Sequence, residues 1–456
     1  MSVAHDYLGN PVTAGGAATL AAIDGFVAGF LGYELRILEV LAAADAEPDH
    51  CLANTYAGWL WMFAESPVGP VNAARYLQRA RASQAGATLR ERQNVDLLAR
   101  WIAADIDGAT AVADLILERS PRDLAALKLH QYLNFNRGNC PEMLRVALGS
   151  LPAAGDVAQL HGMLAFAYEQ CHLLPQAEAA ARAALALYAR EPWAQHALAH
   201  VMLTQGRILE GIDLLEAATA DWDGLTSFLY THNWWHLAVF YISEGRFDEA
   251  LGIYDRHVWA RDRDYSQDQI GAVSLLARLE LAGQSVGGRW SAVAHYLAER
   301  RGDVVEPFLT LQYLYGLARA GRAESDELLD AIGRHADEAP AAVRGVWADI
   351  ARPAAHGLVA HARGDYVTCR AQLGPALGRL LEIGGSHAQR DLFQQIYLDS
   401  LVHSGACTAA QQLLEERRRA EPDGVALNRM LAALYGQLRL PAQAAAAAAR
   451  ADRPRR

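Results

Sequence analysis

The chain has 456 residues, of which 52% are hydrophobic, and its formal net charge is −11. This length exceeds one ordinary globular core, so the sequence predicts either several domains or an array of repeats. Proteins that bind nucleic acid usually carry a basic surface, so no nucleic-acid partner is expected of this acidic chain. Two short basic runs, at residues 417–419 and 453–456, both lie near the C-terminus.

The apolar stretches are far shorter than the roughly 20 residues that span a bilayer, so no membrane partner is expected. The first ten residues lack a basic region followed by an apolar core, so no secretory signal is expected. The five cysteines have no CxxC spacing, which suits a reducing compartment. These features together predict a cytoplasmic protein.

Residues 1–50 are expected to form a helical cap with an irregular lead-in, and residues 51–456 one continuous array of helical hairpins. Hairpin turns are expected at Gly138, His172, Gly206, Gly245, Gly321, Gly364 and Gly405. Four prolines are expected between hairpins, where a fixed φ can start or stop a helix. They are Pro121, Pro152, Pro192 and Pro422.

The clearest hairpin begins at Trp234. Leu237, the small Ala238 and Tyr241 follow at helical spacing, and Gly245 provides the turn. A small residue where two helices cross lets the backbones approach, and glycine permits the sharp turn. This pattern resembles the tetratricopeptide repeat, and the resemblance covers most of the chain from about residue 50 onward. It implies an all-α, right-handed solenoid of tetratricopeptide-like helical hairpins.

Several blocks carry a more specific resemblance. They read DYLGNPVT from residue 6, HALAHVMLTQGR from residue 196, HNWWHLAVFYISEGRFDEALGIYDRHV from residue 232, LELAGQSVGGRW from residue 279 and IGGSHAQRD from residue 383. These blocks resemble the tetratricopeptide repeat protein 38 family, which implies a fold and leaves the reaction open. The chain is more distantly similar to the tetratricopeptide-like proteins of toxoflavin (azapteridine) biosynthesis, which implies oxidative chemistry in secondary metabolism.

Two pairs of histidines stand four residues apart, which places each pair on one face of a helix. The pairs are His196 with His200 and His232 with His236. With 16 histidines in the chain, chance gives about 0.6 such pairs, so the spacing alone does not decide their role. In repeats of the kind that this chain resembles, the second, fifth, ninth and twelfth residues of the first helix face the groove. The residues that fall on these positions are Trp193, His196, His200, His232, Trp235 and, in the preceding hairpin, Glu169.

Two helices that each offer a histidine pair can give three or four nitrogens to one ion. The expected metal ligands are therefore His196, His200, His232 and His236. Imidazole suits several divalent transition metals and does not choose among Fe, Co, Zn, Ni, Cu and Mn. The candidates for a fifth ligand or a proton acceptor are Glu169 and His161. The candidates for substrate contacts are Trp193, Trp235 and His387, and Ser386 is expected to cap the helix that His387 begins.

The first functional hypothesis is a metal-dependent enzyme that acts on a small, nitrogen-rich heterocyclic substrate in the groove. The alternative is a non-catalytic scaffold that binds a peptide or a protein partner. Peptide grooves of this kind use lysine, arginine and asparagine where this chain has histidine and tryptophan, which favours the small-molecule hypothesis. A metal-free ligand groove and purely structural histidines also remain open. The chain has no phosphate-binding loop, GxSxG elbow, HExxH motif or dinucleotide fingerprint, so those enzyme classes are not expected.

Overall fold

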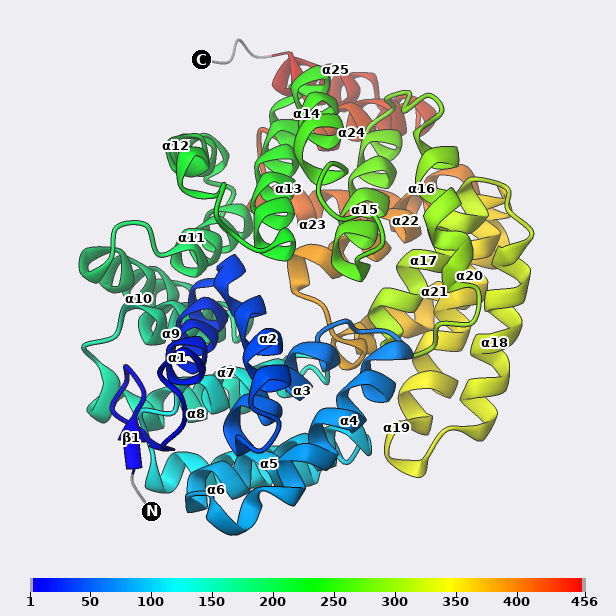
Figure 1. Cartoon of the computed structure of the whole chain (residues 1–456). Coiled ribbons are helices and arrows are strands. Elements are labelled where there is room, and N and C mark those ends of the chain that lie inside the picture. The colour runs from blue at the N-terminus through cyan, green and yellow to red at the C-terminus, as the bar shows by residue number, and fades with distance from the viewer. Residues whose placement is uncertain (1–2, 453–456) are drawn as a thin grey trace. The chain divides into compact units, whose positions relative to one another are not determined.

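The computed structural model describes residues 3–452, and these residues form helices almost throughout (Figure 1). The all-α class and the tetratricopeptide-like hairpins predicted from the sequence are confirmed. The chain divides into two compact units, residues 1–198 with 220–229 and residues 199–219 with 230–456. The division falls inside two unbroken helices, α11 (Pro192–Thr204) and α13 (Ser227–Glu244). The single array over residues 51–456 stays a prediction.

The first unit stacks antiparallel helix pairs around one apolar core. The paired helices are α3 (Cys51–Met62), α4 (Val68–Ala82), α5 (Leu89–Ile102), α6 (Ile106–Arg119), α7 (Leu124–Phe135), α8 (Cys140–Ala154), α9 (Ala158–Gln170) and α10 (Leu174–Leu187). Small residues lie where these helices cross, and Ala113, Ala147 and Ala181 are fully buried. Such contacts bind each pair mainly to its neighbours, as in other repeat arrays.

The second unit repeats the same arrangement. Its helices are α12 (Ile208–Ala218), α14 (Phe247–Ile253), α15 (Ser266–Leu281), α16 (Arg289–Leu297), α17 (Pro307–Arg319), α18 (Glu324–Glu338), α19 (Ala341–Val346), α20 (Arg352–Ala362), α21 (Tyr366–Ala376), α22 (His387–His403), α23 (Cys407–Ala420), α24 (Val425–Gln437) and α25 (Pro441–Ala451). None of the described helices has the length and hydropathy that crossing a bilayer requires. The basic run at residues 453–456 lies outside the described residues.

All seven predicted turn residues adopt a left-handed backbone, with φ between 58° at His172 and 79° at Gly364. This conformation ends a helix by turning the chain back on its last carbonyls. After α13, for example, the amide of Gly245 donates to the carbonyl of Ile242 at 3.0 Å. One proline prediction is wrong, because Pro152 lies inside α8. The helix tolerates it there because α8 ends two residues later, at Ala154.

The predicted irregular lead-in contains a two-stranded antiparallel hairpin, β1 (Val3–His5) and β2 (Pro11–Thr13). Two short strands are marginal by themselves, so side chains of α5 hold them. Glu91 accepts a hydrogen bond from the Thr13 hydroxyl at 2.5 Å, and Arg90 donates to the Pro11 carbonyl at 3.1 Å. The hairpin thereby ties the N-terminal segment to the helix pairs.

Helix α1 (Ala17–Gly32) packs across α3 and α7, the first helices of two pairs in the first unit (Figure 1). The ring of Phe26 stacks on that of Tyr56 in α3, with centroids 4.3 Å apart. Lys128 of α7 donates to the last carbonyls of α1, those of Phe30 and Leu31. The chain therefore covers part of its own repeat surface in this unit.

Candidate functional site

Two helices carry the paired histidines. Helix α11 begins at Pro192, whose fixed φ suits a first helical turn, and the Glu191 carboxylate accepts a hydrogen bond from the amide of Ala194. Helix α13 begins at Ser227 and runs to the turn at Gly245. Because each helix is regular, both histidines of a pair point from the same face of their helix.

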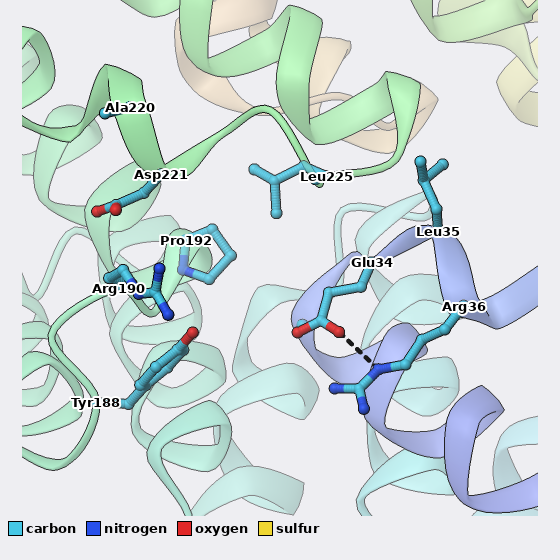
Figure 2. Close-up of a pocket in the computed structure, with 11 residues that line it drawn as sticks. Glu34, Leu35, Arg36, Tyr188, Arg190, Pro192, Ala220, Asp221 and Leu225 are labelled. Carbon is cyan, nitrogen blue, oxygen red and sulfur yellow. Dashed lines mark ion pairs between the residues drawn. The ribbon is translucent and has the colours of Figure 1, made fainter. Parts of the chain in front are cut away.

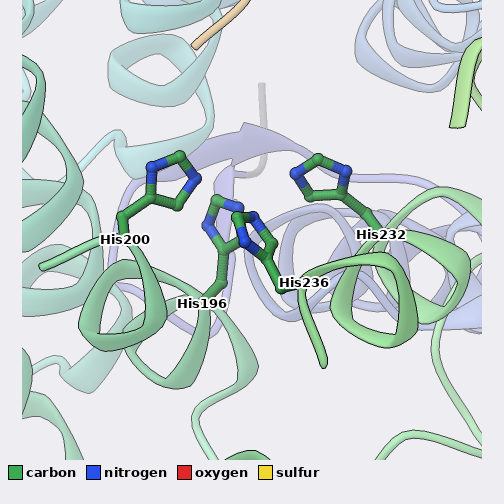
Figure 3. A group of neighbouring side chains, drawn as sticks. All are labelled: His196, His200, His232 and His236. Atoms are coloured by element: carbon green, nitrogen blue, oxygen red, sulfur yellow. The ribbon is translucent and has the colours of Figure 1, made fainter. Parts of the chain in front are cut away.

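The structure brings the four predicted ligands together (Figure 3). His196, His200, His232 and His236 each offer a nitrogen, and these nitrogens lie within 4.8 Å of one another. Three of them belong to the second unit, and His196 lies one turn before His200 on the unbroken α11. Bonds of about 2.1 Å to one ion would place neighbouring nitrogens roughly 3–3.5 Å apart, so these side chains would rotate toward one another to hold an ion.

The cluster is largely shielded from water. His196 is 1% exposed, His200 and His236 are 0% exposed, and His232 is partly exposed. Burial, together with the neighbouring His200, lowers the pKa of His232 to about 3. A neutral imidazole keeps the lone pair that a metal ion needs, so His232 is in its ligating form at neutral pH.

Two tryptophans pack on the histidine rings. Trp193 stacks on His196 with centroids 4.3 Å apart, and Trp235 lies parallel to His232 at 5.4 Å. These contacts restrict the rotamers of both histidines, as supporting contacts commonly do around metal ligands. Trp235 is only 1% exposed. Substrate contact by either tryptophan stays a prediction.

His387 begins α22, and the predicted cap at Ser386 is confirmed. The Ser386 hydroxyl accepts a hydrogen bond from the backbone amide of Gln389 at 3.2 Å, and the Ser386 backbone amide donates one to the Oε1 atom of Gln389 at 2.9 Å. The His387 ring lies edge-on to that of His200, with centroids 5.5 Å apart. It is partly exposed, so it lies at the accessible side of a buried histidine.

The two predicted proton acceptors lie on α9 of the first unit. Glu169 is 0% exposed, and the side-chain Nε2 of Gln170 donates to its carboxylate at 2.6 Å. The Nε2 atom of His161 lies 2.8 Å from the carbonyl oxygen of Gly155, at the end of α8. No candidate ligand group in the described residues includes His161. Catalytic roles for both residues stay predictions.

Sequence analysis did not single out a group of buried ionisable residues in the first unit. The Lys128 ammonium nitrogen lies 3.3 Å from the ring centroid of Tyr33, and burial lowers the Lys128 pKa well below its usual value. Burial also raises the pKa of Glu191 to about 7, and none of the described residues donates a hydrogen bond to its Oε1 atom. No sequence motif signals this group, because its members come from three distant segments.

A pocket of about 670 Å³ also lies in the first unit (Figure 2). Its polar lining includes Glu34, Arg36, Tyr188, Arg190 and Asp221. The guanidinium of Arg36 pairs with the Glu34 carboxylate at 2.6 Å, but both side chains are more than a third exposed. Exposed pairs of this kind add roughly 0–1 kcal/mol and fix little geometry. The histidine cluster is therefore the stronger candidate for a functional site.

No protein-family model matches the chain. Solved structures with similar folds include a monomeric mutant of IFIT1 with Gppp-AAAA, at 11% identity over 88% of this chain and 90% of that chain, with a TM-score of 0.42. The human IFIT1 dimer with m7Gppp-AAAA shares 12% identity over 96% and 90% of the two chains, with a TM-score of 0.38. Naa15/Naa10 bound to HypK-THB shares 13% identity over 95% of this chain and 68% of that chain, with a TM-score of 0.26. All three TM-scores are below 0.5, so these similarities assign neither a family nor a function to this chain.

Proposed function

We propose that the protein is a metal-dependent enzyme that acts on a small, nitrogen-rich heterocyclic substrate. The observation that supports this function is the buried cluster of four imidazoles whose nitrogens lie within 4.8 Å of one another. The proposed ligands are His196, His200, His232 and His236. We further assign proton transfer to Glu169 or His161, and substrate contacts to Trp193, Trp235 and His387.

The donor set favours a divalent transition metal. It offers four imidazole nitrogens, which suit Fe, Co, Zn, Ni, Cu or Mn better than the oxygen-preferring Mg²⁺ and Ca²⁺. Such an ion, when bound, would supply Lewis acidity, and an ion that takes five or six ligands would keep a position for an exchangeable ligand beside the four histidines. His232 and His387 are the partly exposed members of the group, so we expect a substrate to approach from their side.

The resemblance to known families bears on the reaction class. Two of the blocks that resemble the tetratricopeptide repeat protein 38 family carry His196, His200 and His387, so we propose membership of that family. The more distant similarity to proteins of toxoflavin biosynthesis makes an oxidative step in secondary metabolism our proposed reaction class. We also propose a cytoplasmic location, because the five cysteines form no disulfide within the described residues.

The alternative function is a non-catalytic scaffold that holds a peptide or protein partner. Packing of α1 across α3 and α7 disfavours this alternative in the first unit, because a peptide would compete there with the protein's own helix. The scaffold hypothesis also assigns no role to four buried imidazoles in one place.

Elemental analysis of protein purified without an affinity tag tests the proposed function. We expect about one transition-metal ion per chain, as four ligands to one ion imply. His200→Ala and His236→Ala should each remove most of the metal while circular dichroism still shows helices. His403→Ala is the control, since this exposed histidine lies at the far end of α22 and should keep full metal content. Wild-type protein that stays metal-free after incubation with each of the six metals would support the scaffold.

A further inference from the structure

Two glycines with positive φ values form the loop before α22. Gly384 and Gly385 have φ values of 86° and 74°, which other residues rarely adopt. A Cβ atom on Gly385 would lie 2.7 Å from the ring of Phe308. Arg390 donates hydrogen bonds to the carbonyls of both glycines. The position of His387, two residues after Gly385, is therefore tightly set from the N-terminal side.

An ionic cluster holds the first turn of α22, which directly follows this loop. Arg278 of α15 is 4% exposed and donates to the carbonyl of Ala388 at 2.7 Å. It also donates to the Asp391 carboxylate at 3.2 Å. Arg417 of α23 donates to both oxygens of Asp391. Side chains of two other helices thus converge on the first turn of α22.

Stability alone does not account for this cluster. Removing a guanidinium and a carboxylate from water costs several kcal/mol per ion, and apolar side chains of similar volume often give equal stability. The charged groups add geometric specificity, because their hydrogen bonds fix the positions of the Ala388 carbonyl and the Asp391 carboxylate. The Arg278 guanidinium also lies 5.4 Å from the ring centroid of Trp235, on the helix that carries His232 and His236. One side chain therefore contacts both α13 and the helix start that carries His387.

We propose that Arg278 is a positioning residue, which holds His387 at the accessible edge of the histidine cluster. His387 there donates a hydrogen bond from its imidazole to a ligand that occupies the exchangeable position of the metal. The ligand class is a molecule with an acceptor nitrogen, such as a ring nitrogen of a heterocycle. This inference rests on the metal site proposed above.

Azide binding to the cobalt-loaded protein tests this role. Azide offers an acceptor nitrogen, and its coordination changes the visible absorption of Co²⁺, so a titration gives its dissociation constant. His387→Ala and Arg278→Met should each raise that constant about tenfold, the usual effect of a lost charge-assisted hydrogen bond, with cobalt content unchanged. His403→Ala, on the same helix, should leave the constant unchanged.

The isosteric Asp391→Asn variant weakens the hydrogen bond between Arg278 and residue 391 and keeps the buried guanidinium. Its azide affinity tests the inference if Arg278→Met does not fold. A purely structural cluster would lower the melting temperature in these variants and leave azide affinity within twofold of wild type, which would overturn the inference. Unchanged azide affinity in His387→Ala would overturn it as well. Failure of the wild-type protein to take up cobalt is a different result, because it removes the metal site and this inference with it.

Discussion

Glu191 is a buried acid whose protonation should appear in the stability of the protein. Burial raises its pKa to about 7 from an ordinary value near 4.5. Between these values the folded chain keeps a proton that the unfolded chain releases, so the free energy of unfolding should fall as pH rises from 4.5 to 7. The loss amounts to at most ~3.5 kcal/mol, because each unit of pKa shift corresponds to about 1.4 kcal/mol.

Glu191→Gln removes this ionisation and keeps an oxygen that can accept from the Ala194 amide. We expect the variant to gain stability relative to wild type at pH 8 and to show little gain at pH 5. Urea unfolding at the two pH values measures the difference. Glu299→Gln is the matched control, since Glu299 is 85% exposed and its replacement should alter neither value. Equal effects of Glu191→Gln at both pH values would contradict the prediction.

The histidine pairs could be recognised from the sequence because their geometry is local. Spacing of four residues places each pair on one face of its helix. Counting back from the turn glycines gives the position of each histidine within the helix. The neighbours His200 and His387 could not be paired in this way, because their contact depends on how α22 packs in the second unit. The same holds for Lys128 and Tyr33, which meet only because α1 crosses α7.

At the scale of elements, two glycines with nearly equal φ allow the cost of backbone strain to be distinguished from the cost of a steric clash. Gly385 and Gly405 have φ values of 74° and 75°, but only the first has a neighbour that a Cβ would strike. Gly405→Ala should therefore cost about 1 kcal/mol, the penalty for a left-handed backbone. Gly385→Ala should cost about 1–3 kcal/mol more, because the methyl group must displace the ring of Phe308. Urea midpoints of the two variants measure the contrast, and equal losses would show that Phe308 moves freely.

The helices themselves were largely predictable, and the reason is the turn chemistry between them. A positive φ favours glycine, so the repeated glycines in the sequence predict where the helices end. The hairpin of β1 and β2 was not predicted, because strands of three residues show no measurable alternation. Pro152 was misplaced because a proline near the last turn of a helix looks the same in sequence as one just beyond it.

At the scale of the whole molecule, the chain divides into two compact units, so we expect metal binding to raise the melting temperature of one unit more than that of the other. A ligand that binds only the folded state stabilises it by about 2.7 kcal/mol at a concentration 100 times its dissociation constant. For a unit of roughly 200 residues this raises the melting temperature by about 5–10 °C. Three of the four proposed ligands belong to the second unit, so that unit should receive the effect.

Differential scanning calorimetry of metal-free protein, before and after addition of the metal found by elemental analysis, measures this linkage. We expect the metal to raise the melting temperature of the second unit and to leave that of the first unit unchanged. The reason is that contacts between neighbouring repeats provide most of the stability of a repeat array. In His200→Ala neither part should move, and a chelator should reverse the shift in wild type. A uniform shift of the whole transition, or an equal shift in His200→Ala, would mean that the metal acts elsewhere on the chain.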